Sequence, residues 1–297
     1  MSLLARPYPP LILFVFLCAF SLAYADEKGV LITEELQLKI ADALMAEGEY
    51  YRAVTEYKKF LILFPDSAKA DYVSFKIAMA YFKGEEYGAA AQSFSAMREK
   101  YPESSYAIEA GYREGLSQWK LKNYERARMA LEPVAEQHPR SDYAPRSLAV
   151  ICLAALDENK TEVSRQALKR FLDRYPGHPE AESVREAAMQ LEKYEELPEK
   201  SPVLAGVMSA ILPGSGYFYA EHYGDGITAL LINGLFIVGT VAAINQENYA
   251  VAGIVGGIGV PFYLGNIYGS ANAAKKWNHG VRNEVIQKIH STLTPLL

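Results

Sequence analysis

The sequence predicts an all-α protein in which a solenoid of helix pairs is followed by an α-helical membrane domain. Three observations predict this fold: prolines spaced 37 residues apart, a tyrosine–alanine pattern with the same period, and a glycine-rich apolar region near the C-terminus. Charged residues are concentrated in residues 26–200, whereas residues 202–274 contain almost none. A chain of 297 residues has room for both parts, since single hydrophobic cores stop growing at about 250–300 residues.

The first 25 residues have the pattern of a secretory signal peptide. Arg6 supplies a positive start, residues 11–22 form an apolar run, and Ala23-Tyr24-Ala25 is a small-x-small cleavage site. We therefore expect the mature chain to begin at Asp26, outside the cytoplasm. An uncleaved membrane anchor is the alternative, although the apolar run is shorter than the roughly 20 residues that span a bilayer.

The two cysteines give no framework for a disulfide. Cleavage of the signal would remove Cys18 and leave Cys152, which lies in the apolar stretch 148–153 and is expected to be a small buried hydrophobe. A lipoprotein modified at Cys18 is a further alternative, although Phe16-Leu17 stand where lipidation signals carry small residues. Stability is therefore expected to come from packing and not from cross-links.

An internal repeat of 37 residues organises residues 26–198. Its clearest mark is a series of prolines, each 37 residues after the last: Pro65, Pro102, Pro139 and Pro176. Three further positions keep the same period, namely a tyrosine (Tyr50, Tyr87, Tyr124), an alanine three residues later (Ala53, Ala90, Ala127) and a large residue four beyond the alanine (Tyr57, Phe94, Leu131). A fixed period of this size is typical of a solenoid built from one repeated supersecondary unit.

These positions have a mechanical interpretation. An alanine allows two helices to cross closely, and the large residue one turn later fills the space beside it. The proline ends the second helix because it lacks an N–H and disfavours helical angles in the residue before it. Each repeat is thus an antiparallel helix pair, and the predicted repeats are residues 34–67, 71–104, 108–141 and 145–178, closed by a capping helix at 179–196.

The pattern resembles the tetratricopeptide repeat family, whose second helix begins Gly-x-Tyr-x-x-Ala and ends at a proline. Gly48-Glu49-Tyr50, Ala53 and Pro65 carry this resemblance in the first repeat. The fourth repeat departs from it, with Ser164 for the alanine and Leu168 for the aromatic. The longer period is similar to the envelope branch of the family, which includes the lipoprotein of the outer-membrane β-barrel assembly machine and the periplasmic cell-division coordinators.

The extra residues of the longer period fall between repeats. They are rich in serine and aspartate, as in Pro65-Asp66-Ser67, and these side chains are expected to cap the next helix.

The resemblance implies a concave face lined by the first helix of each repeat, where a protein or peptide partner binds. The predicted partner-binding groove comprises Tyr72, Phe75, Met79, Phe82, Tyr112, Leu116, Trp119 and Lys120. Two interpretations stay open at this point. Exposed apolar stripes usually mark interfaces, whereas aromatic residues at helical spacing are usually core.

Residues 199–274 form the predicted membrane domain. Its apolar stretches are residues 203–220, 226–244 and 249–269, and the second and third are each about long enough to cross a bilayer. Pro213-Gly214-Ser215-Gly216 breaks the first stretch, which favours a re-entrant or short, kinked segment. The motif is similar to the Pro-Gly-x-Gly-x-x-Tyr pattern of small bacterial membrane domains.

The number of crossings depends on the charges that follow the last stretch. Lys275, Lys276 and Arg282 favour a cytoplasmic tail, while the signal peptide puts the array outside the cytoplasm. Three crossings of the inner membrane satisfy both constraints, and two crossings are the alternative. The tail, residues 275–297, carries apolar residues four apart and is expected to be an amphipathic helix at the bilayer surface, with Val281, Val285, Ile289 and Leu293 on one stripe.

No catalytic motif, metal-ligand spacing or cofactor-binding loop is present in the sequence, and a net charge of −5 gives no reason to expect nucleic acid. The sequence therefore predicts a non-enzymatic, membrane-anchored scaffold, without cofactor or metal, whose partners are a protein and the lipid bilayer. A channel or transporter subunit is the alternative, with Asn233, Asn266 and His222 facing a water-filled cavity. An enzyme whose site lacks a recognisable motif is the third possibility.

Overall fold

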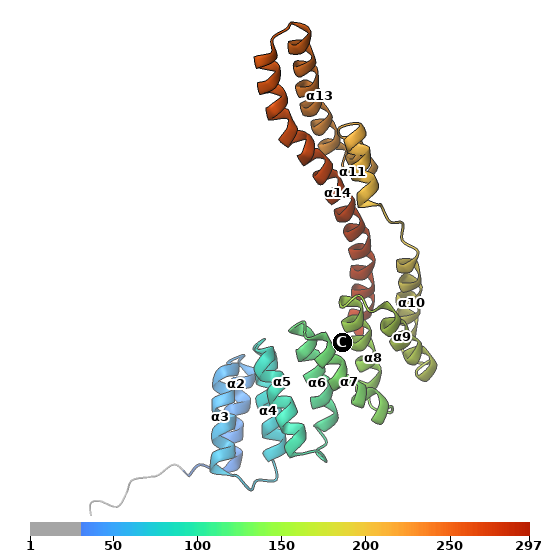
Figure 1. Cartoon of the computed structure of the whole chain (residues 1–297). Helices are drawn as coiled ribbons and strands as arrows, with labels where there is room; N and C mark the ends of the chain where they lie inside the picture. Colours follow the sequence, from blue (N-terminus) through green and yellow to red (C-terminus); the bar gives the residue numbers. More distant parts are fainter. Residues whose placement is uncertain (1–30) are drawn as a thin grey trace, which may run out of the picture. The chain divides into compact units, whose positions relative to one another are not determined.

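The computed structural model describes residues 31–297, which form helices joined by turns and short linkers, with no strand in this range (Figure 1). The predicted fold class is confirmed: helix pairs in a solenoid-like arrangement precede apolar C-terminal helices. The predicted signal peptide and Cys18 lie outside the described residues. Two compact units divide the chain, the first ending at Gly84 and the second beginning at Glu85.

The repeat helices follow one another in pairs. In chain order they are α2 (Glu34–Ala46), α3 (Tyr50–Leu63), α4 (Ala70–Lys83), α5 (Tyr87–Lys100), α6 (Ala107–Lys120), α7 (Tyr124–Gln137), α8 (Tyr143–Asp157), α9 (Thr161–Arg174) and α10 (Ala181–Glu195). The second helix of each pair begins 37 residues after its predecessor (87 − 50 = 37). These helices end where the residue before each proline leaves helical geometry, as Phe64 does with φ −131° and ψ 63°.

The turn inside each repeat contains one residue in the left-handed conformation. The positions are again 37 apart: Gly48 with φ 80°, Glu85 with φ 62°, Lys122 with φ 61° and Asn159 with φ 59°. Only the first repeat has the glycine that this conformation favours. In the other three repeats a residue other than glycine adopts this conformation, at a steric cost of about 1 kcal/mol at each position.

The expected serine and aspartate caps are not found at the starts of α4, α6 and α8, which have no side-chain cap hydrogen bond. The serines instead stabilise a turn that precedes each helix. Ser67 Oγ accepts from the backbone N of Lys69 at 3.2 Å, and Ser141 Oγ accepts from Tyr143 N at 3.1 Å. The linkers contain the predicted residue types, but these serines lie one or two residues before the N-cap position of the next helix.

The cores of the repeats contain the residues that recur with the 37-residue period. Ala53, Ala90 and Ala127 are fully buried, together with the large residue one turn after each, while Tyr50, Tyr87 and Tyr124 are half-buried. In the fourth repeat the Ser164 hydroxyl is buried and donates to the Cys152 backbone oxygen at 3.0 Å. Cys152 is also fully buried, which raises the pKa of its thiol to about 12.

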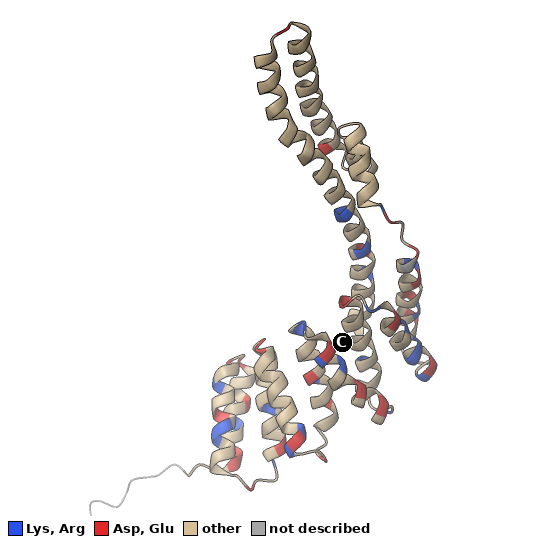
Figure 2. Ribbon diagram, in the orientation of Figure 1, with Lys and Arg blue, Asp and Glu red and all other residues tan. Residues whose placement is uncertain are grey.

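Four helices form the apolar region: α11 (Pro202–Ile211), α12 (Ser215–Tyr219), α13 (Tyr223–Asn245) and α14 (Tyr249–Leu293), and the last is followed by η1 (Thr294–Leu296). Among the described residues, two helices, α13 and α14, are long and apolar enough to cross a membrane. They pair as a hairpin that carries almost no charge, whereas charged residues lie along the lower half of α14 (Figure 2). The Pro-Gly interruption confines α11 to ten residues.

Candidate interaction site

One of the predicted groove residues of the first unit is buried, and the others, Tyr72, Met79 and Phe82, are half-buried. Phe75 on α4 is buried, and Tyr72 and Met79 are half-buried against the core of the first repeat. The Lys76 ammonium lies 5.5 Å from the centre of the Tyr72 ring and 3.4 Å from Asp42. The predicted groove residues of α4 therefore contribute more to packing than to an open surface.

The predicted groove residues of the second unit lie on α6. Tyr112 is fully buried and Leu116 nearly so, whereas Trp119 is half-buried and Lys120 is exposed. Burial raises the pKa of Tyr112, although its hydroxyl group keeps a partner. That hydroxyl donates to the backbone oxygen of Leu297 at 3.0 Å, so the tail of the chain contacts this groove.

The tail covers the groove around Trp119 through an acidic residue on α8. Asp157 accepts from the Trp119 indole N–H at 3.0 Å through one carboxylate oxygen, and its other oxygen lies 2.8 Å from His290 Nε2. The His290 and Trp119 rings stack with centroids 6.0 Å apart. Sequence reasoning missed Asp157 because nothing in its local pattern indicates that a residue far along the chain meets it.

Apolar contacts hold the same segment in place. Ile289, Leu293 and Leu296 of the tail are buried, and α14 packs against α10 and, less extensively, α8 (Figure 1). The Lys288 ammonium also lies 3.9 Å from Glu186 of α10. Residues 275–293 are helical as part of α14, and Ile289 and Leu293 of this segment are covered by protein.

A second junction joins the linker before α11 to α14. The Asn278 side chain makes two hydrogen bonds to the backbone of Lys200, at 2.8 and 2.9 Å. The Lys200 ammonium pairs with Glu221 at 2.6 Å and lies 4.2 Å from the centre of the Trp277 ring. Both ends of the apolar region therefore meet at one place.

The Pro-Gly-Ser-Gly motif forms a tight turn between α11 and α12 that packs on α14. Gly214 has φ 90° and donates its N–H to the Asn266 side-chain oxygen at 3.0 Å, while the Asn266 amide donates to the Ser209 backbone oxygen at 3.0 Å. At Gly216 an added Cβ would lie 1.9 Å from the Ala205 oxygen. The glycines of the motif are thus required by close approach, and the motif has a packing role.

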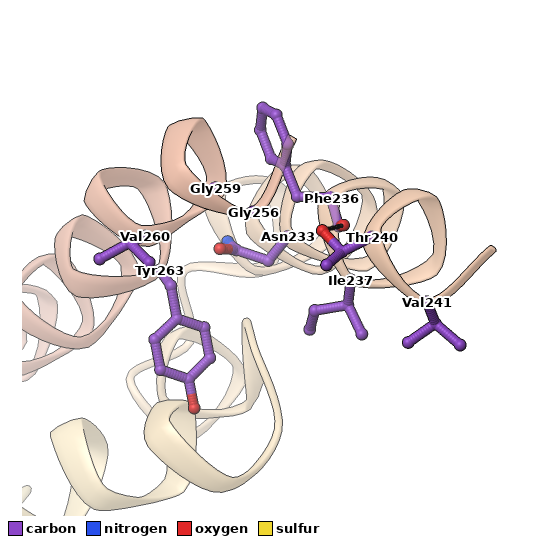
Figure 3. Close-up of a pocket in the computed structure, with 9 residues that line it drawn as sticks. All are labelled: Asn233, Phe236, Ile237, Thr240, Val241, Gly256, Gly259, Val260 and Tyr263. Atoms are coloured by element: carbon purple, nitrogen blue, oxygen red, sulfur yellow. Dashed lines mark hydrogen bonds between the residues drawn. The ribbon is translucent and has the colours of Figure 1, made fainter. Parts of the chain in front are cut away.

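A pocket of about 270 Å³ lies between α13 and α14 (Figure 3). Asn233 and Thr240 are the polar residues of α13 in its lining, and Val260 and Tyr263 face them from α14. Asn233 is buried and donates to the Ala229 backbone oxygen at 2.8 Å, but its own side-chain oxygen has no partner.

The other polar residues named for a channel lie elsewhere. Asn266 is engaged by the Pro-Gly turn, and His222, the residue before α13, lies 3.3 Å from Asp225 in the first turn of that helix. Within residues 31–297, no group of three or more histidine, cysteine, aspartate or glutamate side chains is placed to hold a metal ion.

Two stretches of the array match models of known protein families. Residues 38–105 match a family model described as a tetratricopeptide repeat, and residues 107–185 match one described as an outer membrane lipoprotein. No curated protein matches the sequence. Neither family match extends past residue 185, so the resemblance of the Pro-Gly-Ser-Gly motif to small membrane domains stays a prediction.

Solved structures show similarity at low identity. A structure titled "MamA RS-1 ArsTM double mutant" is 19% identical, with a TM-score of 0.42, over 55% of this chain and 96% of its own. A crystal structure from Bacteroides ovatus, of a candidate protein-binding protein, is 15% identical, with a TM-score of 0.34, over 55% of this chain and 98% of its own. By the family models, residues 38–105 of this chain are similar to tetratricopeptide repeats and residues 107–185 are similar to an outer membrane lipoprotein family.

Proposed function

We propose that this chain is a non-enzymatic scaffold of the bacterial cell envelope, which holds a protein-binding helical array at a membrane. The observation that carries the proposal is the double role of α14. Its first half pairs with α13 in the hairpin that carries almost no charge, and its second half packs on α10 and α8 of the array. A single helix therefore joins the apolar anchor to the repeats without an intervening linker.

The same contacts favour two crossings over the three that the charges favour. Asn278 holds the linker at Lys200, and Ile289 and Leu293 are buried next to the array. A tail in contact with the array lies on the array's side of the membrane, which requires an even number of crossings. We give these contacts more weight than Lys275 and Lys276, because the charge rule is a statistical bias and burial of two large apolar residues contributes about 3–6 kcal/mol.

We place the array in the periplasm and the hairpin in the inner membrane. The signal peptide pattern supports export of the repeats, and the match of residues 107–185 to an outer membrane lipoprotein family supports an envelope location. Helical spans support the inner membrane, since outer-membrane spans are typically β-barrels.

Membrane anchoring is tested by alkaline carbonate extraction of membranes from cells that express the chain. Leu231, Leu235 and Val238 face outward on α13, with 67%, 73% and 67% of each residue exposed. Substitution of all three by lysine is expected to release the chain from the pellet, because each charge in the hydrocarbon costs about 2.5–3.5 kcal/mol. A matched control places lysine at the exposed array positions Tyr51, Ile62 and Met129 and is expected to stay in the pellet. A wild-type chain that carbonate extracts would contradict the proposal.

Partner binding is tested by photo-crosslinking from single positions in intact membranes. A photoreactive residue at exposed Lys83 of α4 or Lys120 of α6, on the helices that carry the predicted groove, is expected to give specific adducts with another protein, and one at Leu235 of the hairpin is not. Adducts that arise only from the hairpin would favour the channel alternative.

Two observations favour the channel alternative: the side-chain oxygen of buried Asn233 has no partner, and a pocket lies beside it. A pure anchor predicts that a cysteine at position 233 does not react with water-soluble thiol reagents, whereas a channel predicts that it does.

A further inference from the structure

We propose that residues 288–297, here called the docked segment, bind to the face of the array around Trp119. While they are bound, partner helices cannot bind to this face. A partner uses this face only when the docked segment leaves it. The proposal rests on the function of the array as a binding scaffold and adds to it a named surface, a type of partner and an internal competitor.

The face has the features of a recognition site because it combines apolar burial with oriented polar groups. Ile289, Leu293 and Leu296 provide the apolar contact. Asp157 receives hydrogen bonds from both sides, at 3.0 Å from Trp119 and at 2.8 Å from His290. Simple apolar packing of a helix end would not require these paired polar contacts.

Charge complementarity indicates what the face binds. Asp157 and Glu186 on the array face His290 and Lys288 on the docked segment. A helix that replaces the docked segment needs two large apolar residues four apart and a basic or hydrogen-bond-donating residue beside them, since otherwise the Asp157 carboxylate would lose a partner at a cost. The expected partner is therefore an amphipathic helix with a basic edge.

The docked segment is separated from the rest of α14 by a stretch without a fully buried residue. Asn278 is buried and so is Ile289, but residues 279–287 between them are half-buried or exposed. This stretch is about 14 Å of helix. Gly280 lies in it, and a Cβ added there would meet no atom within 4 Å, so close packing does not explain this glycine.

A glycine inside an exposed helix weakens it by about 1 kcal/mol relative to alanine. Position 280 is consequently the weakest point of the helix between Asn278 and the docked segment, and a break there frees the docked segment while Asn278 keeps the hairpin attached to the linker.

The test uses a fluorescent peptide with the sequence of residues 284–297 and the detergent-solubilised full chain, with binding followed by anisotropy. In the variant Ile289→Glu/Leu293→Glu the chain's own segment cannot dock, so the peptide is expected to bind at least about tenfold more tightly than it binds wild type. Adding Trp119→Ala to this variant is expected to remove most of that gain. Asn283→Glu changes the exposed stretch only and is the matched control, with wild-type binding expected.

Two further variants keep the test decisive. If circular dichroism shows that the double glutamate variant has lost helix, His290→Ala is used in its place. His290→Ala retains the apolar pair and is expected to raise peptide affinity a few-fold. Gly280→Ala strengthens the helix and is expected to slow hydrogen exchange of the docked segment by roughly fivefold.

Equal peptide binding by wild type and a folded released variant, or undiminished binding after Trp119→Ala, would overturn the proposal. Failure of membrane anchoring would show in carbonate extraction and not in this assay.

Discussion

The imidazole of His290 stacks on the indole of Trp119, with the two rings inclined by 16° and their centroids 6.0 Å apart. This contact joins the end of the chain to the third repeat, and Asp157 connects both rings through its carboxylate. The sequence leaves open whether the groove around Trp119 is exposed or covered, and in the structure the chain itself fills it.

Asp157→Ala is expected to loosen the tail, because it leaves the Trp119 indole N–H and His290 without their acceptor. Loss of a hydrogen bond to a charged group costs about 1.5–3 kcal/mol, so amide hydrogen exchange in residues 288–296 should accelerate at least tenfold. Asp173→Ala, at an exposed position of α9, is the control and should leave exchange in the tail unchanged. Unchanged exchange in Asp157→Ala would mean that apolar contacts alone hold the tail.

Two buried asparagines of the apolar region, Asn233 and Asn266, should respond oppositely to leucine. Asn266→Leu removes the partners of Gly214 N and the Ser209 oxygen, and each stranded group costs about 1–3 kcal/mol. Asn233→Leu removes an oxygen that has no partner, so stability should be equal or higher. Thermal unfolding in detergent separates the two, and a larger loss at position 233 than at 266 would contradict this account of the hairpin.

Gly216→Ala should be among the most damaging small substitutions in the chain. The added methyl would lie 1.9 Å from the Ala205 oxygen, and relieving such an overlap typically costs about 1–3 kcal/mol or more. Gly224→Ala adds the same methyl in open space and should be neutral or slightly stabilising. Unfolding temperatures of the two variants provide the comparison, and equal values would show that the Pro-Gly turn is not closely packed.

Lys122→Gly should stabilise the third repeat. Lys122 has φ 61°, and glycine adopts this conformation without the penalty of about 1 kcal/mol that other residues bear. Met129→Gly, in the exposed middle of α7, should destabilise by a similar amount because glycine is a poor helix former. Chemical denaturation of the array measures both effects. A loss of stability in Lys122→Gly would show that the Lys122 side chain makes a contact that stabilises the repeat by more than the conformational penalty.

The regular parts of this fold could be predicted because they depend on local patterns. The 37-residue spacing of Ala53, Ala90 and Ala127 predicts the helix pairs, and the prolines mark where the second helices end. The left-handed turns at Glu85 and Lys122 could also have been inferred from the alignment of these positions with Gly48. Ser164 shows how a departure from the pattern is accommodated, since its hydroxyl finds an acceptor in the Cys152 backbone.

The contacts of the tail could not be predicted in the same way. The spacing of Ile289 and Leu293 predicts one apolar face but does not say what covers it, because a bilayer surface and a protein surface select the same pattern. The prediction of Tyr112 and Trp119 as a partner-binding surface depends on the resemblance to the repeat family and on their spacing along one helix. Their actual contacts with Leu297 and His290 depend on the path of a long helix through the whole unit.

The central claim is that the hairpin crosses the membrane twice and returns the tail to the array. Labelling of single cysteines with a membrane-impermeant maleimide tests this most directly, since Cys152 is buried and gives little background. Glu103→Cys reports on the array, Glu247→Cys on the turn between α13 and α14, and Asn283→Cys on the tail, all at exposed positions. In intact spheroplasts, positions 103 and 283 should be labelled and position 247 should react only after the membrane is permeabilised. Labelling of position 103 with protection of position 283 would contradict the account, because the tail could then not contact the array.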